Sequence, residues 1–437
     1  MSFAGLDTAA VARSLSALLE EPEDWVDAYF ERIEEAAWHG PEGPPPGRVR
    51  REQGLAVRLV RGRRTYLASR DEIDGASFAR ALRQVARAWS ASPGAEPRLA
   101  MPGWDEPAPL AELGGFAEAV ETAIARRRVA FPLRLAVRSH RREIQVVGPR
   151  LVPAPEGERF FSLEAEMPWG RWGTLLPTLD TAAAERVAGA LVARFRARQA
   201  LPPRPGREQV VLFPAAAAVL LHEAIAHALE ADVLGASGNP GRALGVKLGP
   251  SDLSVLDDPG SAPGETRRTT DDEGLAVCRR WLLRAGAVEQ PLADMAWARA
   301  SADLVPGAGR RGRRDLPPGP RSTHLEVLTG SRAESELLAG AEGGLAVPEA
   351  DWGRLDPGTG RFELSVPYAR RIRGGEPSEA VGRFRLSSTV ADLLGAIYGV
   401  GNRSEPAGAG WCAKGGQRLA VWATTPALAL GAVEIRP

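Results

Sequence analysis

Residues 214–232 form an apolar run, rich in alanine and leucine, that also carries two histidines and two glutamates. Pro214 stands at its start, where proline suits the first turn of a helix. The run therefore predicts a buried helix that extends to about Asp232. Buried helices rarely hold histidine or glutamate unless these side chains are paired, hydrogen-bonded or bound to metal. This stretch consequently predicts the core of a metal-hydrolase site.

The two histidines of this run, His222 and His227, are five residues apart, and Glu223 directly follows the first. In the familiar H-E-x-x-H arrangement the two ligands are four apart and share one helix face. Five residues separate side chains by roughly 140° around an ideal helix, against roughly 40° for four. A π-helical turn would bring the rings into line, so we expect a widened turn between them. On spacing alone, two core histidines with satisfied hydrogen bonds are an equally good interpretation.

A catalytic zinc site takes three protein ligands and leaves one position for water. With His222 and His227 as ligands, Glu223 would be the base that takes a proton from that water. Cys412 ranks first as third ligand, because its glycine-rich surroundings let the backbone approach a site closely. Lys414 is expected to favour the thiolate that zinc requires.

The remaining histidines and the second cysteine are weaker candidates. His324 starts an expected strand and ranks second as third ligand. His39, beside a Pro/Gly-rich segment, and His140, in an arginine-rich turn, are expected to be exposed. Cys278 falls in an apolar strand and is interpreted as a core thiol.

Composition narrows the classes of function. The formal net charge is zero, so no overall field favours nucleic acid or an anionic membrane. The basic side is almost wholly arginine, since Lys247 and Lys414 are the only lysines, and individual arginine clusters are therefore discounted. The cluster at 126–142 alternates with apolar residues, which favours a half-buried sheet with a solvated outer face. Together with a second cluster at 310–314, it is the whole case for nucleic-acid binding, which we do not expect.

Two cysteines provide no disulfide framework, and no apolar stretch approaches the roughly 20 residues of a membrane span. Asp7 and Arg13 interrupt any apolar core of a signal peptide. A soluble cytoplasmic protein without membrane contact is the expectation.

The 437 residues are enough for two domains, and the proline-rich linker at 201–207 predicts domains of 1–203 and 204–437. Strand-like runs cluster instead of alternating with helices, which predicts an α+β fold with largely antiparallel sheets and packed helices. The metal-bearing helix belongs to the second domain. Long loops, often functional, are expected at 235–274 and 303–322.

The expected helices span 7–20, 74–89, 116–127, 181–198, 214–232 and 389–398. The expected strands span 55–60, 65–69, 129–138, 143–148, 158–166, 209–213, 275–283, 287–292, 323–328, 361–366, 382–387, 417–424 and 430–435, while 25–32 fits helix or strand.

Several motifs together resemble the TldD/PmbA family of metalloproteases. The most specific is the H-E-x-x-x-H helix, preceded by Leu-Leu and followed by Leu-Glu-x-Asp, over Leu220–Asp232. Asp-Asp-Glu-Gly precedes an expected hairpin at Asp271–Gly274, and a late cysteine stands in a Gly-x-Cys-x-Lys-x-Gly-Gln setting at Gly410–Gln417. The Tyr29–Arg32 segment and the Arg61–Arg64 turn agree more loosely. The resemblance extends along most of the chain.

This resemblance implies two α+β domains and a zinc ion (Zn²⁺) held by His222, His227 and Cys412, with Glu223 as the catalytic acid/base. It implies hydrolysis of peptides or unfolded protein segments, which we expect to bind as an added strand along a sheet edge. It also implies a metal-free, TldE-like partner subunit, and a homodimer is the other possibility. The complete ligand set indicates the active partner; the alternative is a non-catalytic binding or modulating subunit.

The sequence departs from the family pattern at Ala226, Ala228 and Ala231, where the family usually has glycine. The 303–322 loop resembles its counterpart only weakly. These departures concern helix packing, substrate preference and partner choice more than the metal ligands.

Overall fold

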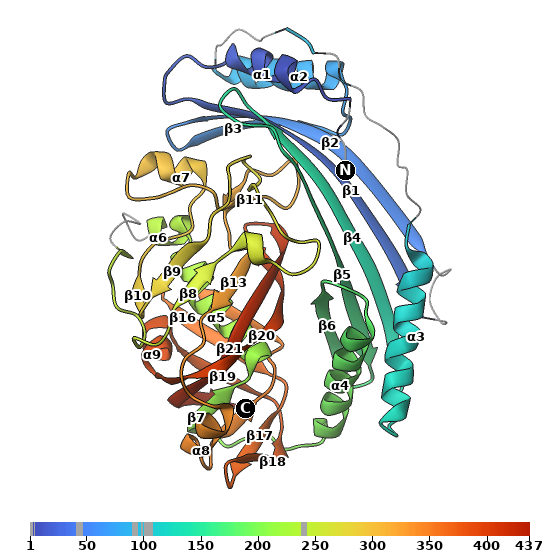
Figure 1. Ribbon diagram of the computed structural model, residues 1–437, viewed down its shortest axis with the longest axis vertical. Coiled ribbons are helices and arrows are strands. Elements are labelled where there is room, and N and C mark those ends of the chain that lie inside the picture. The colour runs from blue at the N-terminus through green and yellow to red at the C-terminus, as the bar shows by residue number, and fades with distance from the viewer. Residues whose placement is uncertain are drawn as a thin grey trace.

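The computed structural model describes residues 3, 5–40, 47–89, 95–97, 99, 108–236 and 243–437. Two main β-sheets organise these residues: a six-stranded sheet in the N-terminal half and a thirteen-stranded sheet in the C-terminal half (Figure 1). The fold is α+β with mostly antiparallel strands, as the clustering of strand-like runs predicts. Linker residues 201–204 have no regular structure. A domain boundary between residues 203 and 204 stays a prediction.

The N-terminal sheet has the strand order β3-β2-β1-β4-β5-β6, and all neighbouring strands are antiparallel. Helices cover one face of it at both ends (Figure 1). Phe30 packs against the helices at residues 8–16 and 75–89. Ala36, on the same face of the same strand, packs against the helices at residues 110–126 and 181–197. The elements are β1 (Trp25–His39), β2 (Arg48–Arg61), β3 (Arg64–Arg70), β4 (Arg134–Val147), β5 (Pro155–Met167), β6 (Gly170–Leu176), α1 (Thr8–Ser16), α2 (Gly75–Trp89), α3 (Leu110–Arg126) and α4 (Thr181–Ala197).

Strand β4 corrects two expectations. Residues 129–138 and 143–148 were expected as two strands, but Arg134–Val147 is continuous, so His140 lies within a strand and not in a turn. The apolar side chains change faces along it: Val137 packs against α3 and α4, whereas Ile144 and Val146 belong to a cluster on the opposite face. A pattern that changes face in mid-strand looks in sequence like two strands separated by a turn.

In the C-terminal half the long strand β21 (Gln417–Arg436) is central, because it pairs with β7, β13, β19 and β20. The expectation of separate strands at 417–424 and 430–435 is therefore wrong; a register shift between Leu430 and Val433 bends one strand. The other strands are β7 (Gly206–Leu212), β8 (Val255–Asp257), β9 (Arg280–Arg284), β10 (Ala287–Val288), β11 (Gly309–Arg310), β12 (Gly319–Pro320), β13 (His324–Val327), β14 (Leu345–Val347), β15 (Trp352–Asp356), β16 (Arg361–Val366), β17 (Ala369–Arg373), β18 (Glu376–Val381), β19 (Phe384–Thr389) and β20 (Ile397–Lys414).

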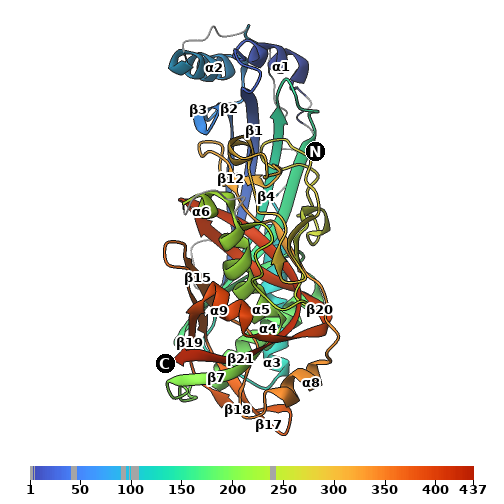
Figure 2. The same ribbon diagram turned by 90° about the vertical axis from the view of Figure 1, so that its left-hand side faces the viewer.

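The alanine-rich run begins as α5 (Pro214–Leu221), which packs against β20, β21 and β15 (Figure 2). Apart from the exposed Ala215, its alanines and leucines are buried in the largest hydrophobic cluster of the described residues. The run is therefore a buried helix as predicted, but it ends at Leu229, because Glu230 is extended and a separate helix begins at Ala231. The remaining C-terminal helices are α6 (Ala231–Ala236), α7 (Met295–Ala300), α8 (Glu334–Gly340) and α9 (Val390–Gly395).

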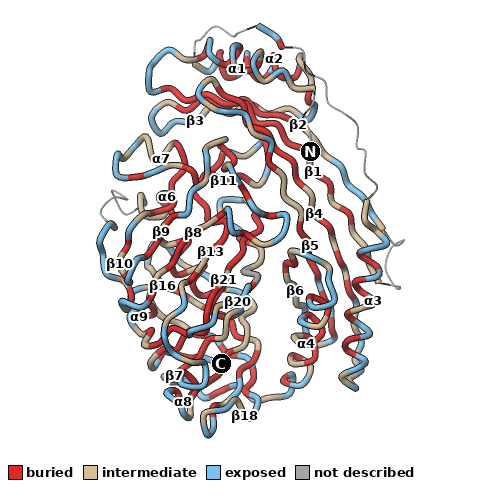
Figure 3. Tube along the Cα trace, viewed as in Figure 1, coloured by how far each residue is buried: buried red, intermediate tan, exposed pale blue. Residues whose placement is uncertain are grey.

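The second face of the N-terminal sheet contacts the C-terminal half, and Figure 3 shows buried residues running through both. Arg142, from the cluster expected on a solvated outer face, is only 8% exposed. It donates to Glu31 Oε1 at 2.9 Å and to the carbonyl of Arg311 at 2.8 Å. The expectation of a solvated face is wrong at this end of β4, because the C-terminal half covers it. None of the helices in the described part of the chain combines the length and apolar character that a membrane span requires.

Candidate metal centre

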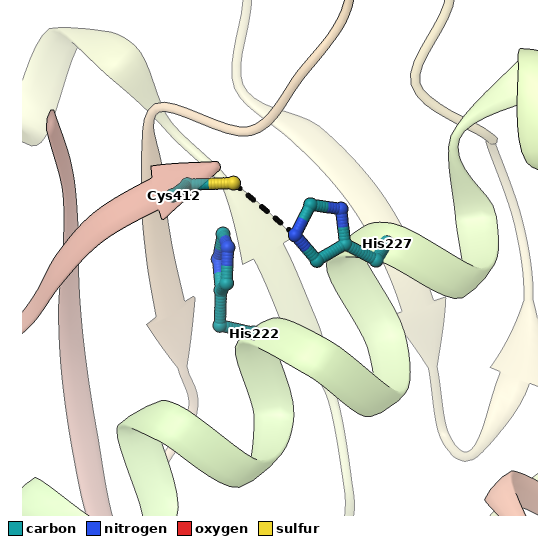
Figure 4. A group of neighbouring side chains, drawn as sticks. All are labelled: His222, His227 and Cys412. Carbon is teal, nitrogen blue, oxygen red and sulfur yellow. Dashed lines mark hydrogen bonds between the residues drawn. The ribbon is translucent and has the colours of Figure 1, made fainter. Parts of the chain in front are cut away.

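The helix widens where the two histidines lie. After α5 the chain makes a π-helical turn over His222–Ala226 and a 3-10 turn over His227–Leu229. The backbone N–H of His227 donates to the carbonyl of His222, five residues earlier. The predicted widened turn is thereby confirmed. The centroids of the two imidazole rings are 4.7 Å apart, so both rings lie on the same side of the helix (Figure 4).

Cys412, near the end of β20, completes a cluster with these rings (Figure 4). Its Sγ lies 3.1 Å from His227 Nε2, and one ligand atom from each of Cys412, His222 and His227 lies within 4.8 Å of the others. All three residues are buried. Two nitrogens and one sulfur in this proximity are a donor set typical of zinc.

His222 supplies the strongest sign that the cluster suits a metal. Within the described part of the chain, neither of its buried ring nitrogens has a hydrogen-bond partner. Burial, with further contributions from His227 and Arg321, holds its pKa well below the ordinary value, so the ring is neutral and can offer a lone pair. A buried unpartnered polar group costs about 1–3 kcal/mol, and a bound metal ion would remove that cost. The residues present fit a zinc ion.

His227 is oriented by a carboxylate. Its Nδ1 lies 2.9 Å from Glu230 Oε2, which leaves Nε2 for the centre of the cluster. Burial opposes the charged form of His227, but the Glu230 carboxylate and the hydrogen bonds with Cys412 and Glu230 raise its pKa to about 11. Such a carboxylate–histidine pair fixes the tautomer and ring orientation of a metal ligand.

Lys414 was expected to lie beside the thiol of Cys412, but Arg321 occupies that position. Lys414 Nζ donates to Glu230 at 2.5 Å and to Asp232 at 2.6 Å, so it supports the acid that orients His227. Arg321 contacts the thiol instead: its Nη2 lies 3.3 Å from Cys412 Sγ and 3.1 Å from the Cys412 carbonyl oxygen. Sequence reasoning missed Arg321, because it set arginine clusters aside as a compositional bias.

Glu223 lies on the same π-helical turn and is half-buried. Burial raises its pKa above the ordinary value of a glutamate, although the backbone N–H of Leu355 in β15 donates to its carboxylate. Gly353, also in β15, gives it room, since a Cβ at that position would stand 2.5 Å from Glu223 Cγ. The carboxylate is thus packed between the π-helical turn and β15.

The other sequence candidates lie outside this cluster. His324 Nδ1 is 2.9 Å from Ser261 Oγ and its Nε2 is 3.1 Å from Thr424 Oγ1, which accounts for both ring nitrogens. His39 and His140 are half-buried and not exposed as expected. Cys278 is exposed and precedes β9, so its interpretation as a core thiol in a strand is wrong.

The Asp-Asp-Glu-Gly motif, Asp271–Gly274, is a buried turn with structural partners. Asp271 Oδ2 accepts from the N–H of Gly309 at 3.0 Å. Glu273 Oε1 accepts from Arg58 of β2 at 2.7 Å, and its Oε2 accepts from the N–H of Met295 at 2.7 Å. These contacts join the motif to the N-terminal sheet and to neighbouring loops, and not to the histidines.

Comparison with known proteins identifies the family of the chain. Residues 205–435 match the family model of the PmbA/TldA metallopeptidase C-terminal domain. A protein named "Metalloprotease" from Methanothermobacter thermautotrophicus is 30% identical over 228 residues, which are 52% of this chain and 49% of the relative. The "Metalloprotease TldD homolog" of Haemophilus influenzae is 30% identical over 237 residues, 53% of this chain and 48% of the relative.

Zinc itself is named in one further relative, the "Zinc metalloprotease TldD homolog" of Saccharolobus solfataricus, 23% identical over 50% of this chain and 49% of its own length. The chain spans about half the length of the curated relatives it matches. The crystal structure of TldE from Thermococcus kodakarensis has the same fold, with a TM-score of 0.74 and 18% identity over 98% of this chain and 99% of that one. From the match of more than half of its residues to the family model, the chain belongs to the PmbA/TldD family.

Proposed function

We propose that this chain is a zinc-dependent peptidase whose metal is held by His222, His227 and Cys412. The observation that carries the proposal is the pair of unpartnered, buried ring nitrogens of His222, next to His227 Nε2 and Cys412 Sγ. A structural core histidine would have satisfied hydrogen bonds. A ligand position explains both the burial and the missing partners.

When bound, a zinc ion supplies Lewis acidity to a water molecule and to a peptide carbonyl at the same place. The protein residues supply orientation. Glu230 holds His227 through Nδ1, and Lys414 holds Glu230 in turn. This chain of contacts keeps the ligand nitrogen aimed at the centre when substrate enters.

Glu223 is the proposed general base and acid. It is adjacent to His222 on the π-helical turn, and burial raises its pKa, so its carboxylate takes up a proton more readily than an exposed glutamate. In the proposed reaction it accepts a proton from the attacking water and delivers it to the leaving amine.

The proposed substrate is a peptide or an unfolded protein segment that binds as an added strand on β15. Among the described strands β15 pairs only with β16. The N–H of Leu355 in β15 donates to Glu223, so β15 runs directly past the proposed base. Trp352, 40% exposed, offers apolar surface on the same strand. Main-chain pairing at a sheet edge gives affinity with little sequence selectivity.

Two variants test the proposal on a labelled, unstructured polypeptide such as casein. Glu223→Gln keeps the size of the side chain and should abolish cleavage while one zinc per chain stays bound. Cys412→Ser should lose the zinc and the activity together. Cleavage by Glu223→Gln at the wild-type rate would refute the role of the base. Bound zinc without cleavage in the wild-type chain would instead favour a binding or modulating subunit.

Assembly with a TldE-like partner subunit or with a second copy of the chain belongs to the same proposal, as the family resemblance implies. The native mass of the complex, measured together with its zinc content, distinguishes these two assemblies from a monomer. Activity is best assayed on the species that this measurement identifies.

A further inference from the structure

Residues 309–321, here called the arginine loop, connect the N-terminal sheet to the strand that carries Cys412. The loop begins with β11, ends just after β12, and contains four buried arginines that are each at most 5% exposed: Arg310, Arg311, Arg314 and Arg321. Burying a guanidinium is costly unless it is paired and hydrogen-bonded. The partners of these arginines therefore show what the loop holds together.

One set of contacts attaches the loop to β1. Glu31, fully buried on β1, accepts from the backbone N–H of Arg314 at 3.1 Å through Oε2. The guanidinium of Arg311 lies 3.7 Å from Asp27 Oδ1, also on β1. Arg142 of β4 donates to the Arg311 carbonyl. The N-terminal sheet thus fixes the backbone of the loop as well as its side chains.

A second set of contacts joins the loop to both strands of the β20–β21 hairpin. Arg321 donates to the Cys412 carbonyl, and its Nη1 donates to the Lys414 carbonyl at 3.2 Å. Arg310 donates to the carbonyl of Ala420 in β21 at 3.1 Å. At the hairpin turn Gln417 Oε1 accepts from the N–H of Gly312 at 2.6 Å.

We propose that the arginine loop positions Cys412 for the metal, with Arg321 as the positioning residue and Glu31 as its anchor in the N-terminal sheet. This inference rests on the proposed function, because it assigns a role around the zinc that the proposed function requires. It adds a role for the N-terminal half, which holds the loop that contacts one of the three proposed ligands.

The geometry of Arg321 explains how it acts. One nitrogen of Arg321, Nη2, contacts both the sulfur and the carbonyl oxygen of Cys412. Arg321 therefore fixes the Cys412 side chain relative to the Cys412 backbone. The charged guanidinium thereby fixes the position of the sulfur that would bind the metal. Residues that orient a ligand in this way typically contribute about 10–100-fold to metal affinity.

The first test measures zinc affinity by competition with a chromophoric chelator in the full chain. Arg321→Met should weaken zinc binding by about 10–100-fold, and Arg321→Lys, which keeps the charge but not the forked geometry, should lie between. Arg313→Met is the matched control, because Arg313 belongs to the same loop but is exposed and pairs with Asp315. It should bind zinc like the wild type.

A cobalt-substituted sample provides a readout that general loss of stability does not change. The thiolate-to-cobalt charge-transfer band should shift or weaken in Arg321→Met and Arg321→Lys, and stay unchanged in Arg313→Met. An Arg321→Met chain with affinity within about twofold of wild type and an unchanged band would overturn the proposal. Should Arg321→Met not fold, the same criterion applies to Arg321→Lys.

The anchor is tested by a pair of glutamates on β1. Glu31→Gln weakens the contact to the loop, whereas Glu34→Gln changes a buried glutamate that pairs with Arg51. Glu31→Gln should lower zinc affinity several-fold and Glu34→Gln should not; equal effects would overturn the anchor. A wild-type chain that binds no zinc refutes the proposed function and the loop together. A chain that binds zinc without cleaving peptide refutes only the peptidase.

Discussion

Gly353→Ala tests the position of Glu223 without touching a proposed ligand. A Cβ at residue 353 would stand 2.5 Å from Glu223 Cγ, whereas ordinary contact begins near 3.4 Å. The difference, about 0.9 Å, must be taken up by Glu223, because β15 is held in register by β16, where Gly353 is opposite Leu364. A displacement of about 1 Å of a catalytic group can cost on the order of 10²-fold in rate. We therefore expect Gly353→Ala to lose about that factor in kcat.

The assay compares the cleavage rate, zinc content and melting temperature of Gly353→Ala with those of Gly395→Ala. Gly395 ends α9, and no described atom lies within 4 Å of a Cβ built there. The control should cleave like the wild type, and both variants should retain one zinc per chain. Cleavage by Gly353→Ala at the control rate would refute the placement of Glu223 as the base. Loss of zinc from Gly353→Ala would show that β15 supports the ligands instead.

Two further predictions concern buried polar groups. His222→Leu should abolish zinc binding. It should leave the metal-free chain at least as stable as the metal-free wild type in urea unfolding, because it removes two buried nitrogens without hydrogen-bond partners. A destabilisation of several kcal/mol would contradict this. Burial, followed by the charge of Glu273, raises the pKa of Asp294 from 3.8 to about 7. Between about pH 4 and pH 7 the Asp294 carboxyl is therefore protonated in the folded chain but not in the unfolded chain. The free energy of unfolding should consequently fall as the pH rises through this range. Asp294→Asn, whose amide oxygen can still accept from the N–H of Trp297, should flatten that decline, and an unchanged pH profile would contradict the assignment.

The π-helical turn was predictable because it follows from local geometry. Side chains five positions apart, such as those of His222 and His227, cannot converge on an ideal helix. Convergence therefore required a widened turn, and the structure has one. The strand β4 was misread for the opposite reason. Its apolar residues change face because α3 and α4 cover one part and the C-terminal half covers another. Which partner covers which face is decided by tertiary packing and not by local pattern.

The role of the arginines was likewise beyond sequence reasoning. Arg142 belongs to the cluster at 126–142 that was expected to have a solvated face, and Arg321 lies in the expected loop at 303–322. Their partners, Cys412 and Glu31, are 91 and 111 residues away in sequence, and only the tertiary structure brings them together. Lys414, adjacent to Cys412 in the chain, was a natural candidate for the thiolate but bonds to Glu230 instead. Sequence proximity therefore identified the cysteine but not the cation beside its sulfur.

The central claim is that two imidazoles and one thiolate of this chain bind a single zinc ion. X-ray absorption at the zinc edge of the purified native chain tests it most directly. We expect one zinc per chain with one sulfur at about 2.3 Å and two imidazole nitrogens at about 2.0–2.1 Å. A zinc-free protein, or a zinc spectrum without a sulfur neighbour, would contradict it.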